Sequence, residues 1–157
     1  MKKIIATDIT INKIVENEIK KLGLNADLNH IDTSQVTDMT YLFGYSKFNG
    51  DISKWNVSNV IEMYCMFYES SFNGDISKWN VSNVKYMYGT FWRSKFNQDI
   101  SKWNVSNVES MSRMFSNSKF NQDISKWNVS NVKYMDCMFF NSPLKNYHKR
   151  ELEYFNK

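Results

Sequence analysis

The chain has 157 residues, of which 42% are hydrophobic and 23% are charged, and its formal net charge is +4. These values are typical of one globular domain, and they exclude a disordered chain and a strongly basic one. No apolar run reaches the roughly 18 residues of a membrane-spanning helix, so we expect no membrane insertion. The apolar stretch at residues 4–6 is too short for a signal peptide, which favours a cytoplasmic over a cell-surface location.

The first predicted element is a helix over residues 10–22. Thr10 is a suitable N-cap residue, and Gly23 is suited to the position just after the last turn. The apolar residues recur at helical spacing on one face, and they are Ile11, Ile14, Val15, Ile19 and Leu22. We expect residues 1–23 to form a capping helix that covers one end of the structure that follows.

The central part of the chain is an internal repeat with a period of 24 residues. Thirteen consecutive positions, F-N-x-D-I-S-K-W-N-V-S-N-V, recur from Phe48, Phe72, Phe96 and Phe120, and a diverged copy begins at Leu24. A period of this length is typical of leucine-rich repeats. The predicted fold class is therefore an α/β solenoid that is leucine-rich-repeat-like. Residues 24–143 would form five rungs of 24 residues, and residues 144–157 a C-terminal cap or tail.

Each rung is expected to contain a short strand and a short helix. The W-x-V step has the period of a strand with one buried face, and Asn59 is placed to cap a helix with an apolar stripe. Cys65 and Cys137 occupy the same position three rungs apart, too far for a disulfide, so both are expected to be free thiols. The predicted core contains Phe48, Ile52, Trp55, Val57, Val60, Met63, Phe67, Trp79, Trp103 and Trp127.

The motif D-I-S-K-W-N-V-S-N-V, followed by x-x-M-x-x-M-F and preceded by the diverged opening ADLNHIDTSQVTDMTYLF, resembles the BspA-like leucine-rich-repeat family. The resemblance covers residues 24–143. Members of that family are mostly bacterial surface or lipoprotein-type repeat proteins, and some adhere to host proteins. The resemblance therefore implies a binding role, and it brings no catalytic residues to this chain.

Catalysis finds no support in the sequence. The histidines, His30 and His148, lie far apart without metal-ligand spacing around them, and no nucleophile elbow, phosphate-binding loop or zinc-protease motif is present. We therefore predict that the protein is not an enzyme and has no metal and no cofactor. The positive charge is neither large nor continuous along the repeats, so we do not expect nucleic-acid binding.

Partner binding is predicted in the variable half of each repeat, at positions that point outward from the expected helix. These candidates are Ile61, Tyr68, Trp92, Arg93, Phe140, Tyr41 and Tyr45. Aromatic residues with an arginine are typical of interface hot spots, although the same side chains could instead cover the next rung. We predict a non-catalytic protein-binding repeat module, adhesin- or scaffold-like. The alternatives are a self-assembling structural solenoid and a carbohydrate-binding module that uses the tryptophan column.

Overall fold

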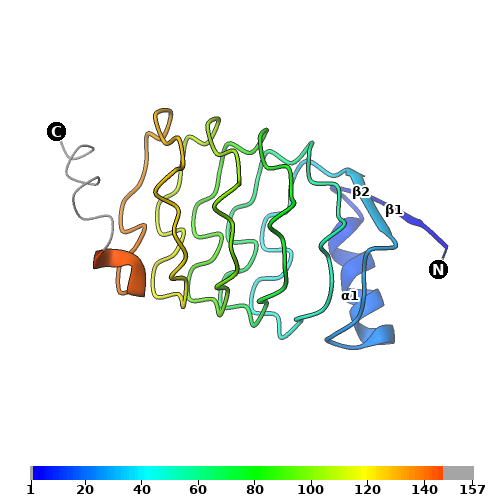
Figure 1. The fold of residues 1–157 in the computed structure, drawn as a ribbon. Coiled ribbons are helices and arrows are strands. Elements are labelled where there is room, and N and C mark those ends of the chain that lie inside the picture. Colours follow the sequence, from blue (N-terminus) through cyan, green and yellow to red (C-terminus); the bar gives the residue numbers. More distant parts are fainter. Residues whose placement is uncertain (1, 147–157) are drawn as a thin grey trace.

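The computed structural model describes residues 2–146 and contains four regular elements (Figure 1). They are strand β1 (Ile4–Thr7), helix α1 (Ile11–Leu22), strand β2 (Ile31–Gln35) and the 3-10 turn η1 (Pro143–Asn146). Strands β1 and β2 are parallel, with Ile4 opposite Ile31, and α1 is the connection that parallel strands require. The helix predicted over residues 10–22 is thus present, and it lies at the N-terminal end of the molecule (Figure 1).

Helix α1 is amphipathic and places its apolar face against the core. Ile11 and Val15 are buried, and Gly23 ends the helix with φ of 95° while its amide donates to the Ile19 carbonyl. The hydroxyl oxygen of Thr10 accepts the Thr7 amide rather than a helix amide, so it fixes the turn between β1 and α1.

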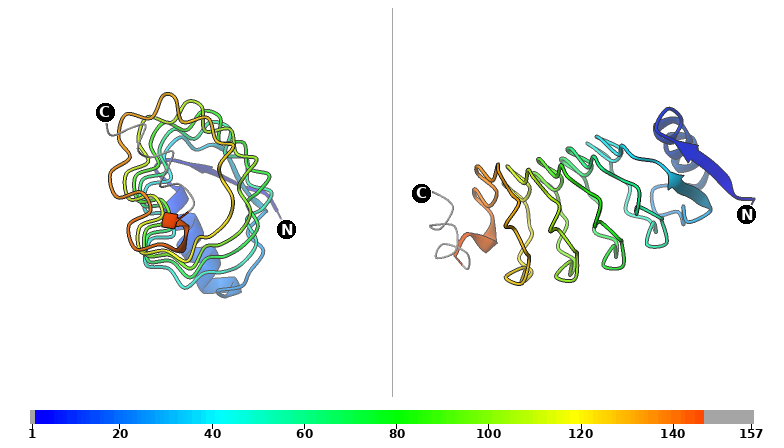
Figure 2. Two further views of the ribbon diagram at one scale, coloured as in Figure 1. Left: turned by 60° about the vertical axis from the view of Figure 1, so that its left-hand side comes forward. Right: turned by 90° about the horizontal axis from the view of Figure 1, so that it is seen from above.

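The rest of the chain winds in stacked coils (Figure 2). Coils 1 to 5 denote residues 24–47, 48–71, 72–95, 96–119 and 120–143. The described residues 36–142 contain turns and isolated bridges but no helix and no strand. The predicted fold class, a leucine-rich-repeat-like α/β solenoid with a strand and a helix in every rung, is therefore wrong.

The expected strands are absent from coils 2 to 5 because side chains replace the backbone ladder between these segments. In coil 1, β2 bonds to β1 through backbone groups. Towards coil 2, the Ser34 carbonyl of β2 accepts a side-chain donor, Asn59 Nδ2 at 2.8 Å, and the bonds between these segments of the later coils are of this kind. Asn83 Nδ2 donates to the Ser58 carbonyl at 2.7 Å, and Trp79 Nε1 donates to the Ile52 carbonyl at 3.1 Å.

The expected helices are absent because two residues in each coil adopt the left-handed backbone conformation. In coil 2 these are Cys65 and Glu69, each with φ of 51°. A right-handed helix cannot continue through such a residue. The segment instead alternates between local turns and contacts with the next coil: the Met66 amide donates to Met63 three residues earlier, whereas the Cys65 amide donates to Tyr88 of coil 3.

The core consists of apolar columns that run along the stack. Phe67 lies 5.4 Å from Phe91, and Phe48 lies 6.3 Å from Phe72, with nearly parallel rings in both pairs. The residues predicted for the core are all buried in the structure, namely Phe48, Ile52, Trp55, Val57, Val60, Met63, Phe67, Trp79, Trp103 and Trp127. One period of the sequence therefore adds one layer to each column.

The constant polar residues of the repeat form turns. The carboxylate of Asp75 accepts the Ser77 amide at 2.8 Å, and the side-chain oxygen of Asn80 accepts the Ser82 amide at 3.2 Å. Both are side-chain-to-backbone bonds of the Asx-turn type. At the far end, Pro143 occupies the position at which Lys119 donates to the preceding coil, and because proline has no amide hydrogen it ends that ladder.

Candidate functional site

Six aromatic side chains from coils 1 to 3 gather in what we call the aromatic patch: Tyr41, Tyr45, Tyr64, Tyr68, Tyr88 and Trp92. The ring of Tyr68 is the centre, 4.9 Å from Tyr45 and 4.7 Å from Trp92. Tyr64 stacks on Tyr88 at 4.8 Å, and Tyr41 joins the two rows with contacts to Tyr64 and Tyr68. The repeat places these rings together because equivalent positions of successive coils are neighbours.

The members of the aromatic patch differ in exposure. Tyr45 is 65% exposed and Tyr41 is 45% exposed, whereas Tyr68 is 9% exposed and Trp92 is half-buried. Tyr68 therefore supports the patch from below, and the outer tyrosines present the surface. Tyr68 was expected to point outward. Its position fits the alternative better, in which it covers a neighbouring coil.

Polar contacts hold the patch in place. The Tyr68 hydroxyl donates to Glu69 at 2.9 Å, and Arg93 pairs with the same Glu69 oxygen at 2.7 Å. The hydrogen bond to Glu69 raises the pKa of Tyr68 to about 12. The guanidinium of Arg113 lies 5.1 Å from the ring centre of Trp92, a cation–π contact that borders the patch in coil 4.

Of the predicted partner-binding residues, the structure brings Tyr41, Tyr45, Tyr68 and Trp92 together, with Arg93 beside them. Ile61 is 39% exposed and belongs to a different column of the coils, and Phe140 is 63% exposed in coil 5. Tyr64 and Tyr88 were missed, because a helix would have placed them beside its buried stripe. Their recurrence at an interval of 24 residues is the signal that could have found them.

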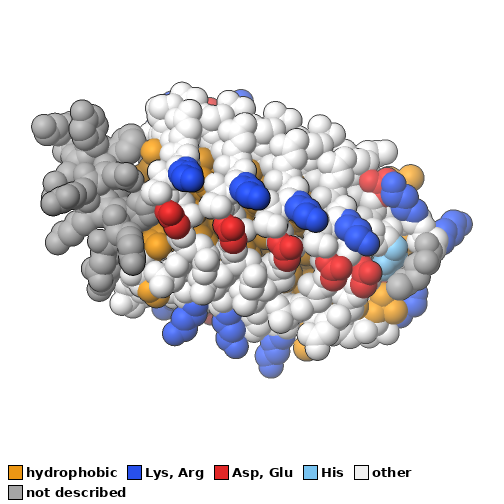
Figure 3. All heavy atoms as spheres, viewed as in Figure 1, with side chains coloured by type: hydrophobic (Ala, Val, Ile, Leu, Met, Phe, Trp, Pro, Cys, Tyr) orange, Lys and Arg blue, Asp and Glu red, His pale blue; other side chains and the backbone are white. Residues whose placement is uncertain are grey.

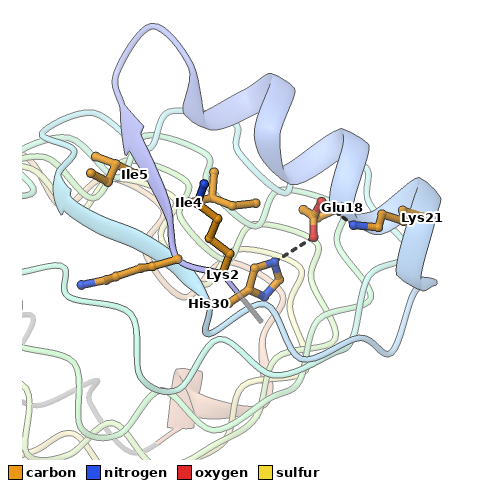
Figure 4. Close-up of a pocket in the computed structure, with 7 residues that line it drawn as sticks. Lys2, Ile4, Ile5, Glu18, Lys21 and His30 are labelled. Carbon is orange, nitrogen blue, oxygen red and sulfur yellow. Dashed lines mark hydrogen bonds and ion pairs between the residues drawn. The ribbon is translucent and has the colours of Figure 1, made fainter.

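A pocket of about 570 Å³ lies at the N-terminal end, between β1, α1 and the segment that leads to β2 (Figure 4). His30 Nε2 lies 2.8 Å from a Glu18 oxygen, and Lys21 lies 3.7 Å from the other, as the dashed lines show. The contact between His30 and Glu18 joins coil 1 to α1, whereas the contact between Lys21 and Glu18 lies within the helix, so this cluster holds α1 against coil 1. Within residues 2–146, no three His, Cys, Asp or Glu side chains are grouped to hold a metal ion, and His148 lies outside the described residues.

The tryptophan column is not available to a ligand. Trp55, Trp79 and Trp103 are each 4% exposed, and Trp127 is 8% exposed. Sugar stacking needs an open ring face, so the carbohydrate interpretation loses the site on which it was based.

The charged columns of the repeat form parallel rows of opposite sign (Figure 3). The amide of Ser53 donates to Asp51 and lowers the pKa of that carboxyl, with a smaller contribution from the charge of Lys54. The same arrangement recurs at Asp75 with Lys78 and at Asp99 with Lys102. The basic row therefore runs beside an acidic row, which differs from the uniform basic surface typical of nucleic-acid binding.

Coils that repeat every 24 residues and bond to their neighbours define a repeat protein. The chain belongs to the family described as Mycoplasma protein of unknown function, DUF285, whose model matches residues 10–117 and 93–157. Comparisons with curated proteins and with solved structures each give no match. In the part of the chain that the structure describes, no helix is both long enough and apolar enough to cross a membrane.

Proposed function

We propose that this chain is a non-catalytic protein-binding repeat module, adhesin- or scaffold-like, and that the aromatic patch is its binding surface. The observation that carries the proposal is the continuity of the patch: three successive coils supply aromatic rings in mutual contact, with exposed faces at Tyr41 and Tyr45. Tyrosine, tryptophan and arginine are the residues most enriched in the energetic centres of protein interfaces.

The centre of the patch is already packed and hydrogen-bonded without a partner. Tyr68 is buried between Tyr45 and Trp92, and its hydroxyl is held by Glu69. A partner therefore orders few side chains on binding, which lowers the entropic cost of association. In this proposal Tyr41 and Tyr45 contact the partner, while Tyr68 and Trp92 support them.

A relationship to the BspA-like proteins is part of this proposal. It is supported by the repeated D-I-S-K-W-N-V-S-N-V motif and by membership of a repeat family. Because some BspA-like proteins adhere to host proteins, the relationship favours an adhesive role. The proposal concerns the relationship to the BspA-like proteins and the binding role. It does not include a helix in each repeat.

The test is a double variant, Tyr41→Ala with Tyr45→Ala, with Tyr134→Ala as a matched control because Tyr134 is 60% exposed in coil 5. Proteins captured by the wild-type chain would be quantified by mass spectrometry, and each specific partner would be measured by calorimetry. We expect the double variant to bind about tenfold or more weakly, as loss of hot-spot residues does, with the control unchanged. Equal binding by the double variant, with an unchanged circular dichroism spectrum, would contradict the proposal.

Self-association is the second candidate, because coil 5 carries exposed aromatic side chains. Phe140 is 63% exposed and Tyr134 is 60% exposed. Sedimentation velocity over a range of concentrations separates the two candidates. A strictly monomeric chain rules out assembly and leaves protein binding through the patch as the proposed function.

A further inference from the structure

A polar groove of about 240 Å³ runs over coils 3 to 5, in columns different from those of the aromatic patch. One of its sides is a column of asparagines and the other a column of charged side chains. The lining residues are Asn83, Asn107, Asn131, Lys85, Glu109 and Lys133.

The asparagine column presents a row of fixed hydrogen-bond acceptors. Asn83, Asn107 and Asn131 each donate Nδ2 to a serine carbonyl of the preceding coil, at 2.7 Å in all three cases. Because Nδ2 is held in this way, the orientation of each amide is set. Among the described residues no group donates to the three Oδ1 atoms, so these oxygens can accept hydrogen bonds from a ligand.

The charged column carries one positive charge beyond its internal pair. Lys133 Nζ lies 2.7 Å from a Glu109 oxygen, and both side chains are partly exposed. Lys85 is exposed and forms no ion pair within 4 Å in residues 2–146, and it acts on the groove only from a distance: the pKa of Glu109 is lowered first by Lys133 and more weakly by the charge of Lys85. A carboxylate on a ligand that fits the groove would form an ion pair with Lys85. This ion pair would be more favourable than the hydration of Lys85 alone.

Two tyrosines flank the charged column. Tyr86 is 37% exposed and Tyr134 is 60% exposed, and a chain of backbone bridges through Ser110 places them two coils apart. Both phenols are close enough to Lys133 to act on it: the pKa of Lys133 is raised first by Glu109 and then, more weakly, by Tyr134 and Tyr86. The tyrosine rings therefore belong to the surroundings of the groove.

We propose that this groove binds a linear acidic saccharide, an oligomer of uronic acid. Sugar hydroxyls would donate to the row of asparagine oxygens, a carboxylate would pair with Lys85, and the exposed faces of Tyr86 and Tyr134 would pack against sugar rings. At about 4.8 Å per coil, the asparagine row extends over roughly 10 Å, which suits an extended oligomer better than a single small ion. This site is independent of the aromatic patch and of the proposed protein binding.

The test is calorimetric titration of the full chain with a hexamer of galacturonic acid. A neutral cellulose hexamer and a glutamate hexapeptide serve as comparators. We expect the acidic hexamer to bind with one-to-one stoichiometry, and both comparators to bind about tenfold or more weakly. The reason is that the neutral sugar brings no carboxylate to Lys85, and the peptide has no sugar rings to pack against Tyr86 and Tyr134.

Substitutions inside and outside the groove test where the acidic hexamer binds. Lys85→Glu should weaken the acidic hexamer about tenfold or more, since it reverses the charge that pairs with the carboxylate. Lys102→Glu is the matched control, because Lys102 is also an exposed lysine but belongs to the constant column, and it should bind as the wild type does. Tyr86→Ala with Tyr134→Ala should also weaken binding, whereas Tyr41→Ala with Tyr45→Ala should not.

Three outcomes would overturn the proposal. The first is no binding of the acidic hexamer at millimolar concentration. The second is a glutamate peptide or a neutral hexamer that binds as tightly as the acidic hexamer. The third is an equal loss of affinity in Lys85→Glu and Lys102→Glu, both folded by circular dichroism. None of these outcomes bears on capture of a protein by the aromatic patch, so the two proposals fail separately.

Discussion

The indole Nε1 of Trp79 donates a hydrogen bond to the backbone carbonyl of Ile52, across one coil and at 3.1 Å. The same bond joins Trp55 to Leu28, Trp103 to Ile76 and Trp127 to Ile100. Each tryptophan thus fills the core of its own coil and satisfies a buried carbonyl of the coil before it. The tryptophan column is a connection between layers.

Trp79→Phe tests this connection. Phenylalanine keeps most of the apolar ring but removes one of the two donors to the Ile52 carbonyl, which still accepts the Trp55 amide at 3.1 Å, so we expect the free energy of unfolding to fall by about 1 kcal/mol. Urea denaturation measures the loss. Trp92→Phe is the control, because Trp92 Nε1 has no hydrogen-bond partner among the described residues. The free energy of unfolding should fall less in this variant. An equal fall in the free energy of unfolding in both variants would show that the indole hydrogen bond of Trp79 does not stabilise the stack.

The left-handed residues predict a stabilising substitution at Cys137. This exposed residue has φ of 57°, a conformation that asparagine tolerates better than cysteine does. Cys137→Asn should raise the free energy of unfolding by a few tenths to about 1 kcal/mol, and Cys137→Val should lower it, because a β-branched residue is strained there. The midpoints of urea unfolding give both values. A valine variant as stable as the asparagine variant would show that position 137 is not left-handed.

Asp32 predicts a loss of stability in acid. A hydrogen bond from Lys3 and another from Ser34 lower the pKa of Asp32 from 3.8 to about 2. Because this pKa is lower in the folded state, the carboxylate stabilises the fold above the unfolded pKa, and its contribution is lost as the pH falls from about 4 towards 2. Urea unfolding over this range should show a shallower pH dependence in Asp32→Asn. A variant that follows the wild-type pH profile would contradict the prediction.

Tyr41 predicts a perturbed phenol titration in the aromatic patch. Its hydrogen bond with Cys65, aided by burial, raises the pKa of Tyr41 from 10.0 to about 12. In Cys65→Ala that bond is absent, so the pKa of Tyr41 should fall towards its ordinary value. Ultraviolet absorbance titration, compared with Tyr41→Phe to identify the group, measures the change. Tyr68, whose pKa is raised by Glu69, provides the internal control because it should keep its value in Cys65→Ala.

The register of the coils and the buried residues could be predicted because both follow from the period of the sequence. A residue such as Phe67 must lie beside Phe91 if equivalent positions are neighbours, whatever the backbone does between them. The helix in each coil could not be excluded in the same way. The stripe of Val60, Met63, Met66 and Phe67 fits helical spacing, and it equally fits a series of turns that buries the same side chains.

The residues that decide between helix and turns give little signal in the sequence. Of the residues at the left-handed position of Cys65, only Gly89 is of the type that favours positive φ, while Tyr41 and Arg113 are not. Their conformation is maintained by bonds to the next coil, such as that from the Arg113 amide to Asp136, which no local propensity contains. The aromatic patch was therefore predicted in part, through columns shared by Tyr68 and Trp92, and missed at Tyr64 and Tyr88.

The ladder between coils joins each residue to a partner in the adjacent period, as the Asn97 amide does with Asn73 and the Asn121 amide with Asn97. Excision or duplication of one whole period inside the array therefore restores the same kinds of bonds at the new junction. Recombination between the gene segments that encode successive coils would give shorter or longer proteins that keep the constant half of every coil. What changes in such descendants is the order of the variable segments, so the binding surface can be rearranged by shuffling without new core packing.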